Sequence, residues 1–351
     1  MQYRNLGATG LKVSVLAFGT MSFAGSGRQS AVGSTDVEEA RRLVDRCLDA
    51  GVNLFDTADV YSGGDSERIL GEALHGRRDR VVLATKVNGR MGDGVNDSGL
   101  SRSHILRGCE ASLRRLGTDW IDLYQVHSWD GNTPLEETLS ALDALVQSGK
   151  VRYVGCSNYS GWHLMKALGI AERAGLERYV TQQINYSLLI REAEYELVPI
   201  AIAEGVGILV WSPLAGGFLS GKFRRGEAAR PGTRWAIQGD QGRFDVERAF
   251  DVVDVVCAIA AAHAVSAAQV ALNWLTRRAG VSSVILGART EDQLVDNLGA
   301  ASWTLTPEEL QRLDDATVPR ILYPYWHQQF SGAGRLGPAD VWPRPTLAAT
   351  R

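Results

Sequence analysis

The sequence has few of the features that mark secreted, membrane-spanning or nucleic-acid-binding proteins. Its 351 residues include only four cysteines, scattered and without a C-x-x-C pair, which favours free thiols in a reducing compartment. No apolar run approaches the roughly 18 residues of a membrane span, and the N-terminus lacks the long apolar core of a signal peptide. The net charge of −3 gives no reason to expect nucleic acid or an acidic membrane surface as partner. These absences predict a cytoplasmic globular protein without membrane insertion.

Two common catalytic signatures are also missing. There is no G-x-G-x-x-G, which an open doubly wound sheet normally places after its first strand to bind a dinucleotide. The six histidines are dispersed and no H-E-x-x-H occurs, so we expect no metal site.

Short apolar runs alternate with amphipathic segments along most of the chain. The apolar runs predict strands at 15–18, 52–55, 81–85, 121–126, 151–155, 180–184, 206–211 and 283–286. Helices are predicted at 36–50, 66–75, 102–116, 134–148, 160–175, 193–204 and 266–279. The strands are rich in Val, Ile and Leu on both faces, as is typical of a buried parallel sheet. The pattern predicts an α/β protein with a single closed (β/α)8 TIM barrel.

Three segments fall outside this repeat. Residues 3–13 predict a short hairpin that turns at Ala8–Thr9–Gly10 and caps the bottom of the barrel. A long break at 212–243 carries six Lys and Arg residues and precedes an extra helix at 245–262. The tail from 319 onward is aromatic and proline-rich, without periodicity. We therefore assign 1–318 to the barrel and 319–351 to an irregular tail of the same domain.

Four polar residues follow predicted strands and point to proton transfer. They are Asp56, Tyr61, Lys86 and His127, and barrels of this kind carry their chemistry at the carboxyl ends of the strands. Taken singly, each is an ordinary surface, core or turn residue, so the prediction depends on their joint occurrence. A nearby ammonium lowers the pKa of a phenol from its ordinary value of about 10.

These four residues are the types that reduction of a carbonyl group requires. Lys86 would lower the pKa of Tyr61, and Asp56 would hold Lys86 in place. Tyr61 then becomes the general acid, and His127 orients the carbonyl oxygen. Such a site needs a hydride source.

Two segments suggest a dinucleotide phosphate site. Residues 216–223, GGFLSGKF, imitate a Walker A motif but place Phe223 where a magnesium-binding Ser or Thr is required, which disfavours an ATPase. Glycine-rich backbone with nearby cations suits a pyrophosphate, although a solvated loop is an alternative. After the last strand, Gly287 to Thr290 would open a helix whose amides favour an anion. Arg289 there suits a 2′-phosphate, and Gln293 and Asn297 would face an adenine, so NADPH is preferred over NADH.

Eight ordered motifs resemble the aldo-keto reductase superfamily over roughly residues 3 to 316. They are LAFGT, NLFDTADVYSGGDSE, LATKV, DLYQVH, VGCSNYS, QINYSLL, WSPLAGGFLSGKF and VILGARTEDQLVDNLGA. The resemblance implies a barrel that binds NADP(H), with Asp56, Tyr61, Lys86 and His127 as the catalytic tetrad. It implies that Ser157, Asn158 and Gln183 hold the nicotinamide carboxamide, that Trp211 stacks on the ring, and that the loop from Ser212 to Lys222 clasps the pyrophosphate. The full set expected at the cofactor is Gly19, Thr20, Met21, Asp56, Ser157, Asn158, Gln183, Trp211, Ser212, Leu214, Gly216, Gly217, Ser220, Lys222, Gly287, Arg289, Gln293 and Asn297.

One branch of the family is most similar. Trp211 stands where many members have Tyr, and this feature, with WSPLAGG-x-x-SGK and SSVILGA, resembles the potassium-channel β subunits and their bacterial relatives. The channel-associated members carry Asn at the histidine position of the tetrad, whereas this chain has His127. The sequence therefore predicts an NADPH-dependent carbonyl reductase, with a cofactor-binding regulatory subunit of a membrane channel as the alternative.

The substrate is the least determined part. Met21, Phe23, Tyr61, Trp129, Tyr323 and Trp326 are the candidate wall residues. Their apolar character predicts bulky hydrophobic or aromatic carbonyls rather than phosphorylated sugars, with oxidation of the corresponding alcohols as the reverse reaction. Contact between copies in a homo-oligomer is an alternative role for the tail.

Overall fold

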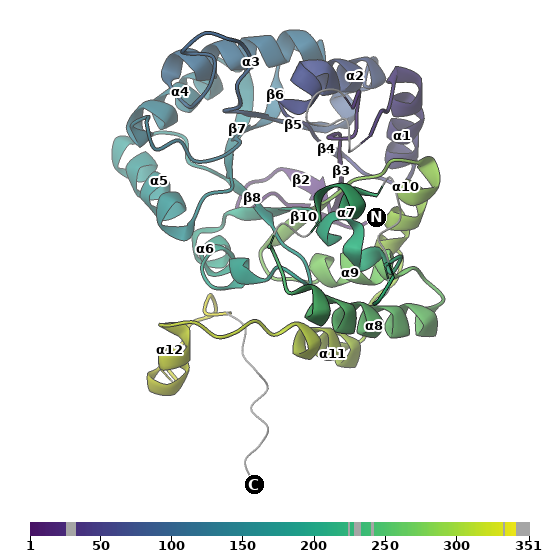
Figure 1. The fold of residues 1–351 in the computed structure, drawn as a ribbon. Coiled ribbons are helices and arrows are strands. Elements are labelled where there is room, and N and C mark those ends of the chain that lie inside the picture. The colour runs from purple at the N-terminus through teal and green to yellow at the C-terminus, as the bar shows by residue number, and fades with distance from the viewer. Residues whose placement is uncertain (26–32, 224, 228–232, 240–241, 333, 342–351) are drawn as a thin grey trace.

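Eight parallel strands close into a barrel in the computed structural model, which describes residues 1–351 except 26–32, 224, 228–232, 240–241, 333 and 342–351 (Figure 1). In chain order the barrel strands are β3 (Leu16–Gly19), β4 (Leu54–Asp56), β5 (Val82–Val87), β6 (Ile121–Val126), β7 (Val151–Ser157), β8 (Thr181–Asn185), β9 (Gly207–Trp211) and β10 (Val281–Leu286). Each pairs with the next, and β10 returns to β3. The predicted TIM barrel is confirmed.

Helices surround the barrel, as Figure 1 shows. They are α1 (Val37–Asp49), α2 (Asp65–Ala73), α3 (Arg102–Leu116), α4 (Leu135–Gln147), α5 (Gly161–Ala174), α6 (Leu197–Glu204), α7 (Arg234–Gln238), α8 (Val246–His263), α9 (Ala267–Thr276), α10 (Glu291–Leu298) and α11 (Pro307–Thr317). Of these, α7 and α11 were not predicted. The sequence signal for α11 was present, because Thr306 and Glu309 form a capping box and Pro307 occupies the first turn.

The predicted hairpin is present and closes the bottom of the barrel. Strands β1 (Tyr3–Asn5) and β2 (Lys12–Ser14) pair antiparallel, and Arg4 donates hydrogen bonds to the carbonyls of Val281 and Thr276. Gly7, in the turn, has a φ of +58°, and a Cβ there would meet the carbonyl oxygens of Gly205 and Val180 at 2.6 Å. Glycine is therefore required where the hairpin meets the amino ends of β8 and β9.

The tail has more structure than its sequence pattern predicted, and it lies outside the ring of helices (Figure 1). Helix α12 (Tyr325–Ser331) places Tyr325 against Tyr195, with ring centroids 4.9 Å apart. The Tyr195 hydroxyl donates a hydrogen bond to the carbonyl of Arg320. The tail therefore packs beside the segment that leads into α6.

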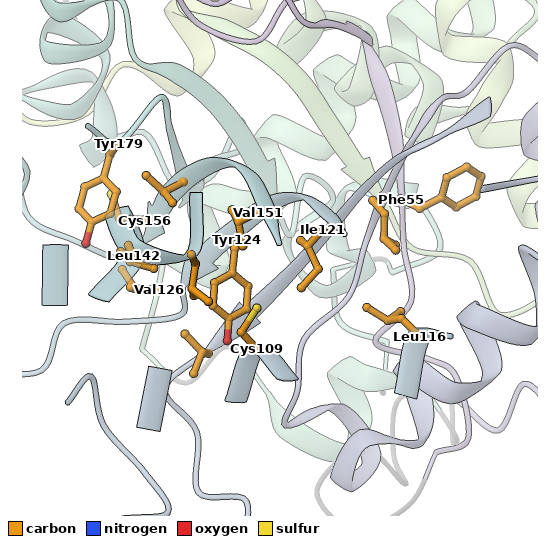
Figure 2. Close-up of a cluster of buried hydrophobic side chains, with 14 of the residues drawn as sticks. Phe55, Cys109, Leu116, Ile121, Tyr124, Val126, Leu142, Val151, Cys156 and Tyr179 are labelled. Carbon is orange, nitrogen blue, oxygen red and sulfur yellow. The ribbon is translucent and has the colours of Figure 1, made fainter. Parts of the chain in front are cut away.

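The core lies mainly between the strands and their helices. Figure 2 shows part of it, where Tyr124 and Val126 from β6 meet Cys109 from α3 and Leu142 from α4. Cys47, Cys109 and Cys156 are buried free thiols, as predicted, whereas Cys257 is only half-buried. Among the described residues, no single helix is long and apolar enough to cross a membrane, and α8 with α9 passes that test only as a pair bent by 97°.

The barrel interior changes from apolar to polar toward the carboxyl ends of the strands. Alternate residues on a strand point inward, so β5 contributes Val82, Ala84 and Lys86, and β6 contributes Leu123 and Gln125. Val82, Ala84 and Leu123, which lie nearer the amino ends of the strands, pack in an apolar cluster within the barrel. Lys86 and Gln125, nearer the carboxyl ends, carry a charge and an amide, and this polar layer forms the floor of the site described next.

Candidate active site

Asp56 and Lys86 form a buried ion pair at the floor of the site. Asp56 is 3% exposed and Lys86 is fully buried. The Lys86 ammonium donates to Asp56 Oδ1 at 2.5 Å and to the Thr57 carbonyl at 2.8 Å. Burial alone would lower the pKa of Lys86, but the charge of Asp56 and the interaction with Tyr61 together raise it. The lysine therefore remains a fixed positive charge.

Tyr61 lies above this pair because the chain turns sharply after β4. Its ring centroid is 5.2 Å from the Lys86 ammonium. The 3₁₀ turn Tyr61–Gly64 has left-handed backbone at Ser62, Gly63 and Gly64, and the Ser62 hydroxyl donates to the carbonyl of Phe23. Two glycines thus allow the tight turn that leads from Tyr61 into α2.

His127 completes the set. Its ring lies edge-on to that of Tyr61, with centroids 5.7 Å apart. Burial, followed by the charge of Lys86, lowers the pKa of His127 to about 3. The imidazole is therefore neutral and offers a hydrogen bond without competing with Tyr61 as the acid.

The expected lowering of the Tyr61 pKa is wrong in its net direction. Burial raises the pKa of the phenol, and this effect exceeds the opposing effect of the Lys86 charge. Lys86 acts on Tyr61 in the predicted sense, but the low-polarity surroundings weigh more. The phenol is consequently protonated across neutral pH.

A cavity of about 700 Å³ opens over these residues. Tyr61, His127 and Met21 line it, together with every residue expected at the cofactor: Gly19, Thr20, Asp56, Ser157, Asn158, Gln183, Trp211, Ser212, Leu214, Gly216, Gly217, Ser220, Lys222, Gly287, Arg289, Gln293 and Asn297. Pro213 and Ala288, inside the two segments expected at the phosphates, also line the cavity, and seven lining residues were not predicted: Ser22, Arg243, Ser266, Ala268, Ile285, Leu286 and Asp296. Among them, Asp296 is held by Ser266 and Gln269, and its position three residues after Gln293, on the same side of the helix, was the available signal.

The amides expected at the nicotinamide are already engaged. Trp211 donates its indole N–H to Asn158 Oδ1 at 3.1 Å, and Asn158 Nδ2 donates to the carbonyl of His127 at 3.0 Å. Gln183 Nε2 donates to Asp56 Oδ2 at 2.9 Å. Asn158 thus links the Trp211 ring to the His127 backbone.

The glycine-rich segment after β9 forms an irregular turn at the cavity. Gly216 and Gly217 have φ values of +68° and +94°, and a Cβ on Gly217 would meet the Lys222 ammonium at 3.1 Å. Bare backbone therefore lies beside a cation. Arg224 and Arg230 from the same basic segment lie outside the described residues.

The predicted substrate wall is not assembled by the structure. Phe23 is fully buried against Phe18, and Trp129 stacks on His163 with centroids 3.8 Å apart. Tyr323 and Trp326 are 74% and 53% exposed in the tail. None of these four is among the described residues that line the cavity. Of the predicted wall, only Met21 and Tyr61 lie there.

Asp59 is an unexpected carboxyl behind the site. It is 1% exposed, and no side chain among the described residues donates a hydrogen bond to either of its carboxyl oxygens. Burial, and then the charge of Glu67, raise the pKa of Asp59 to about 8. Asp59 is therefore largely protonated at neutral pH.

The Asp59→Asn variant is expected to lose part of the pH dependence of stability. The unfolded carboxyl has a pKa of about 4, so its stabilising contribution is full below that pH and is lost as the pH rises to about 8. The free energy of unfolding of the wild type should fall by up to about 1.4 kcal/mol per pH unit in this window, relative to the variant. Urea unfolding of both proteins at about pH 5 and about pH 8 measures these free energies. If the free energy of unfolding changes by the same amount between the two pH values in both proteins, the prediction is wrong.

Comparisons with known proteins match most of the chain. The family model described as "Aldo/keto reductase family" matches residues 15–317. Separately, no group of three or more His, Cys, Asp or Glu among the described residues could hold a metal ion. The chain is 42% identical over 329 residues to the uncharacterized oxidoreductase YrpG of Bacillus subtilis (strain 168), covering 90% of this chain and 95% of that protein. It is 38% identical over 323 residues to a probable voltage-gated potassium channel subunit beta of Oryza sativa subsp. japonica, covering 90% and 96%. It is 35% identical over 344 residues to the versiconal hemiacetal acetate reductase of Aspergillus parasiticus, covering 92% and 99%.

Proposed function

The chain belongs to the aldo/keto reductase family, and from that premise we propose that it is an NADP(H)-dependent reductase of aldehydes or ketones that also oxidises the corresponding alcohols. The observation that carries the proposal is the buried Asp56–Lys86 pair beneath Tyr61 and His127, at one large cavity.

Each of the four residues has a distinct role in the proposed reaction. Tyr61 donates its phenolic proton to the carbonyl oxygen as negative charge develops there. Lys86 stabilises the phenolate that remains, and Asp56 holds the ammonium in position. His127, neutral at physiological pH, donates a hydrogen bond that orients the same oxygen.

The lining residues fit NADP(H). When bound, this cofactor supplies the hydride that carbonyl reduction requires. Gly216 and Gly217 leave room without side chains beside Lys222, whose ammonium suits a pyrophosphate, whereas the Gly217 N–H itself donates to the carbonyl of Leu214. Trp211 offers a flat ring whose orientation is fixed by Asn158. Gln183 keeps its Nε2 on Asp56, so we assign its carbonyl oxygen to the nicotinamide carboxamide.

We expect Arg289→Ala to weaken the preference for NADPH over NADH by about tenfold, because a guanidinium pairs with a phosphate through charge-assisted hydrogen bonds. Arg289 lines the cavity next to Gln293, whose side chain accepts a bond from the Arg289 backbone. The measurement is kcat/KM with each cofactor, and only the NADPH value should fall. Arg68→Ala, which removes an exposed arginine paired with Asp65, is the matched control. An unchanged ratio in Arg289→Ala would remove the 2′-phosphate role.

The substrate class follows from what lines the cavity near the tetrad. Met21 and Trp211 are apolar residues of the cavity wall there, so we propose hydrophobic or aromatic carbonyls. A panel of aldehydes, ketones and alcohols, followed by NADPH absorbance, tests both the activity and its direction. Absence of turnover across the panel, with NADPH bound, would refute the proposed activity.

A regulatory role is the second candidate, because several relatives are named as potassium channel β subunits. In that role the protein would keep NADP(H) bound with little turnover. His127 speaks against it, since the channel-associated members resembled by the sequence carry Asn there. A membrane partner that co-purifies with a protein unable to oxidise NADPH would favour this candidate.

The free thiols support a cytoplasmic location, which cell fractionation with detection of the protein in each fraction tests.

A further inference from the structure

The carboxylate of Asp56 is held on two sides. Its Oδ1 accepts from Lys86, whereas its Oδ2 accepts from Gln183 Nε2 at 2.9 Å and from Gln125 Nε2 at 3.2 Å. The two glutamines also contact each other, since Gln183 Nε2 lies 3.3 Å from Gln125 Oε1. Gln183 lines the cavity, but Gln125 is not among the described residues that do.

Gln125 occupies a position where a polar side chain needs a specific reason. It is fully buried, points into the barrel, and lies opposite Lys86 on β5 and Gly155 on β7. Gly155 leaves room for it, because a Cβ there would meet Gln125 Cγ at 3.3 Å and Thr181 Oγ1 at 2.2 Å. Burying an amide is costly unless it is hydrogen-bonded, and the partners described for this one are Asp56 and Gln183.

We propose that Gln125 is a positioning residue, which holds the Asp56 carboxylate, and through it the Lys86 ammonium, in the arrangement that lets Tyr61 act as the acid. The inference rests on the proposed reductase function. The amide fixes Oδ2, so that Oδ1 remains directed at Lys86, and its N–H dipole offsets part of the carboxylate charge.

Through Asp56, Gln125 affects the pKa of Tyr61. The charged and titratable groups that face this phenol are Asp56, Lys86, Asp59 and His127. Burial raises the pKa of Tyr61 most, Lys86 lowers it, and Asp56 raises it again. Loss of the Gln125 amide leaves the Asp56 charge less compensated, which raises the pKa of Tyr61 further and makes it a weaker acid.

Gln125→Met keeps the size of the side chain and removes its hydrogen bonds. We expect kcat to fall about tenfold, with KM for the carbonyl and Kd for NADPH unchanged, because Gln125 is outside the cavity lining. Gln182→Met is the matched control. Gln182 is a buried glutamine on β8 that donates to the carbonyl of Leu197, away from Asp56, so its loss should leave kcat unchanged.

Gln125→Glu provides a pH-dependent rescue. When protonated, the new carboxyl donates a hydrogen bond to Asp56 as the amide does. When ionised, it adds a second negative charge beside Asp56. We therefore expect kcat near the wild-type value at low pH and a decline as the pH rises, over a range in which wild-type kcat is flat. The pH profile separates this role from a merely structural one.

A titration of Tyr61 by NMR of ¹³C-labelled tyrosine, assigned from the signal missing in Tyr61→Phe, makes the test independent of turnover. The pKa of Tyr61 should be higher in Gln125→Met than in the wild type and in Gln182→Met. Unchanged kcat and unchanged Tyr61 titration in Gln125→Met, or equal losses of kcat in both glutamine variants, would overturn the inference. A shifted titration in a protein that reduces no carbonyl would overturn the proposed function alone.

Discussion

Replacing Tyr61 with phenylalanine is expected to lower kcat for carbonyl reduction about a thousandfold, within the range that a positioned general acid supplies. The phenol is protonated at neutral pH because burial raises its pKa, whereas His127 lacks the extra proton of an imidazolium and its remaining N–H is a far weaker acid than a phenol. The ring stays, so the cavity wall should be intact. NADPH binding, followed by quenching of protein fluorescence, is therefore expected to keep its affinity.

Tyr124→Phe is the control for this variant. Tyr124 is also a buried tyrosine, but it faces the helices, and its hydroxyl has no hydrogen-bond partner among the described residues. Its loss should leave kcat unchanged. If Tyr61→Phe retains more than about a tenth of wild-type kcat with cofactor affinity intact, the proton comes from elsewhere and the proposed mechanism is wrong.

The barrel could be predicted because its strands are short apolar runs between amphipathic segments, and polar residues lie at or just after the ends of several of them. The strand at 121–126 and the helix at 102–116 have the predicted bounds. Asp56 and Lys86 come together because parallel strands bring their carboxyl ends to one face. Gln125 could have been found by the same rule, since it lies two residues before His127 and so on the same face of its strand.

The parts that could not be predicted depend on contacts between segments far apart in the sequence. Trp129 lies where it stacks on His163 of α5, and the tail lies where Tyr325 packs against Tyr195. No local sequence pattern encodes either contact. The direction of the Tyr61 pKa shift is a balance between burial and the charge of Lys86. Sequence indicates which charges are near, but the extent of burial that outweighs them follows only from the packed structure.

Lys86→Met is expected to remove both activity and a large part of the stability. The variant takes away the charge that lowers the pKa of Tyr61, so kcat should fall about a thousandfold. It also leaves the Asp56 carboxylate buried with only the two glutamine amides on its other oxygen. Breaking a buried pair in this way costs about 3–5 kcal/mol, which urea unfolding measures directly.

The double variant Lys86→Met/Asp56→Asn separates the two effects. With both charges gone, no uncompensated carboxylate remains at the barrel floor, and most of the lost stability should return. Activity should not return, because Tyr61 still lacks the positive charge that stabilises its phenolate. Recovery of kcat in the double variant would mean that the single variant fails through unfolding rather than through the acid. Recovery of stability without kcat would establish that Lys86 acts on the chemistry and Asp56 on the placement of Lys86.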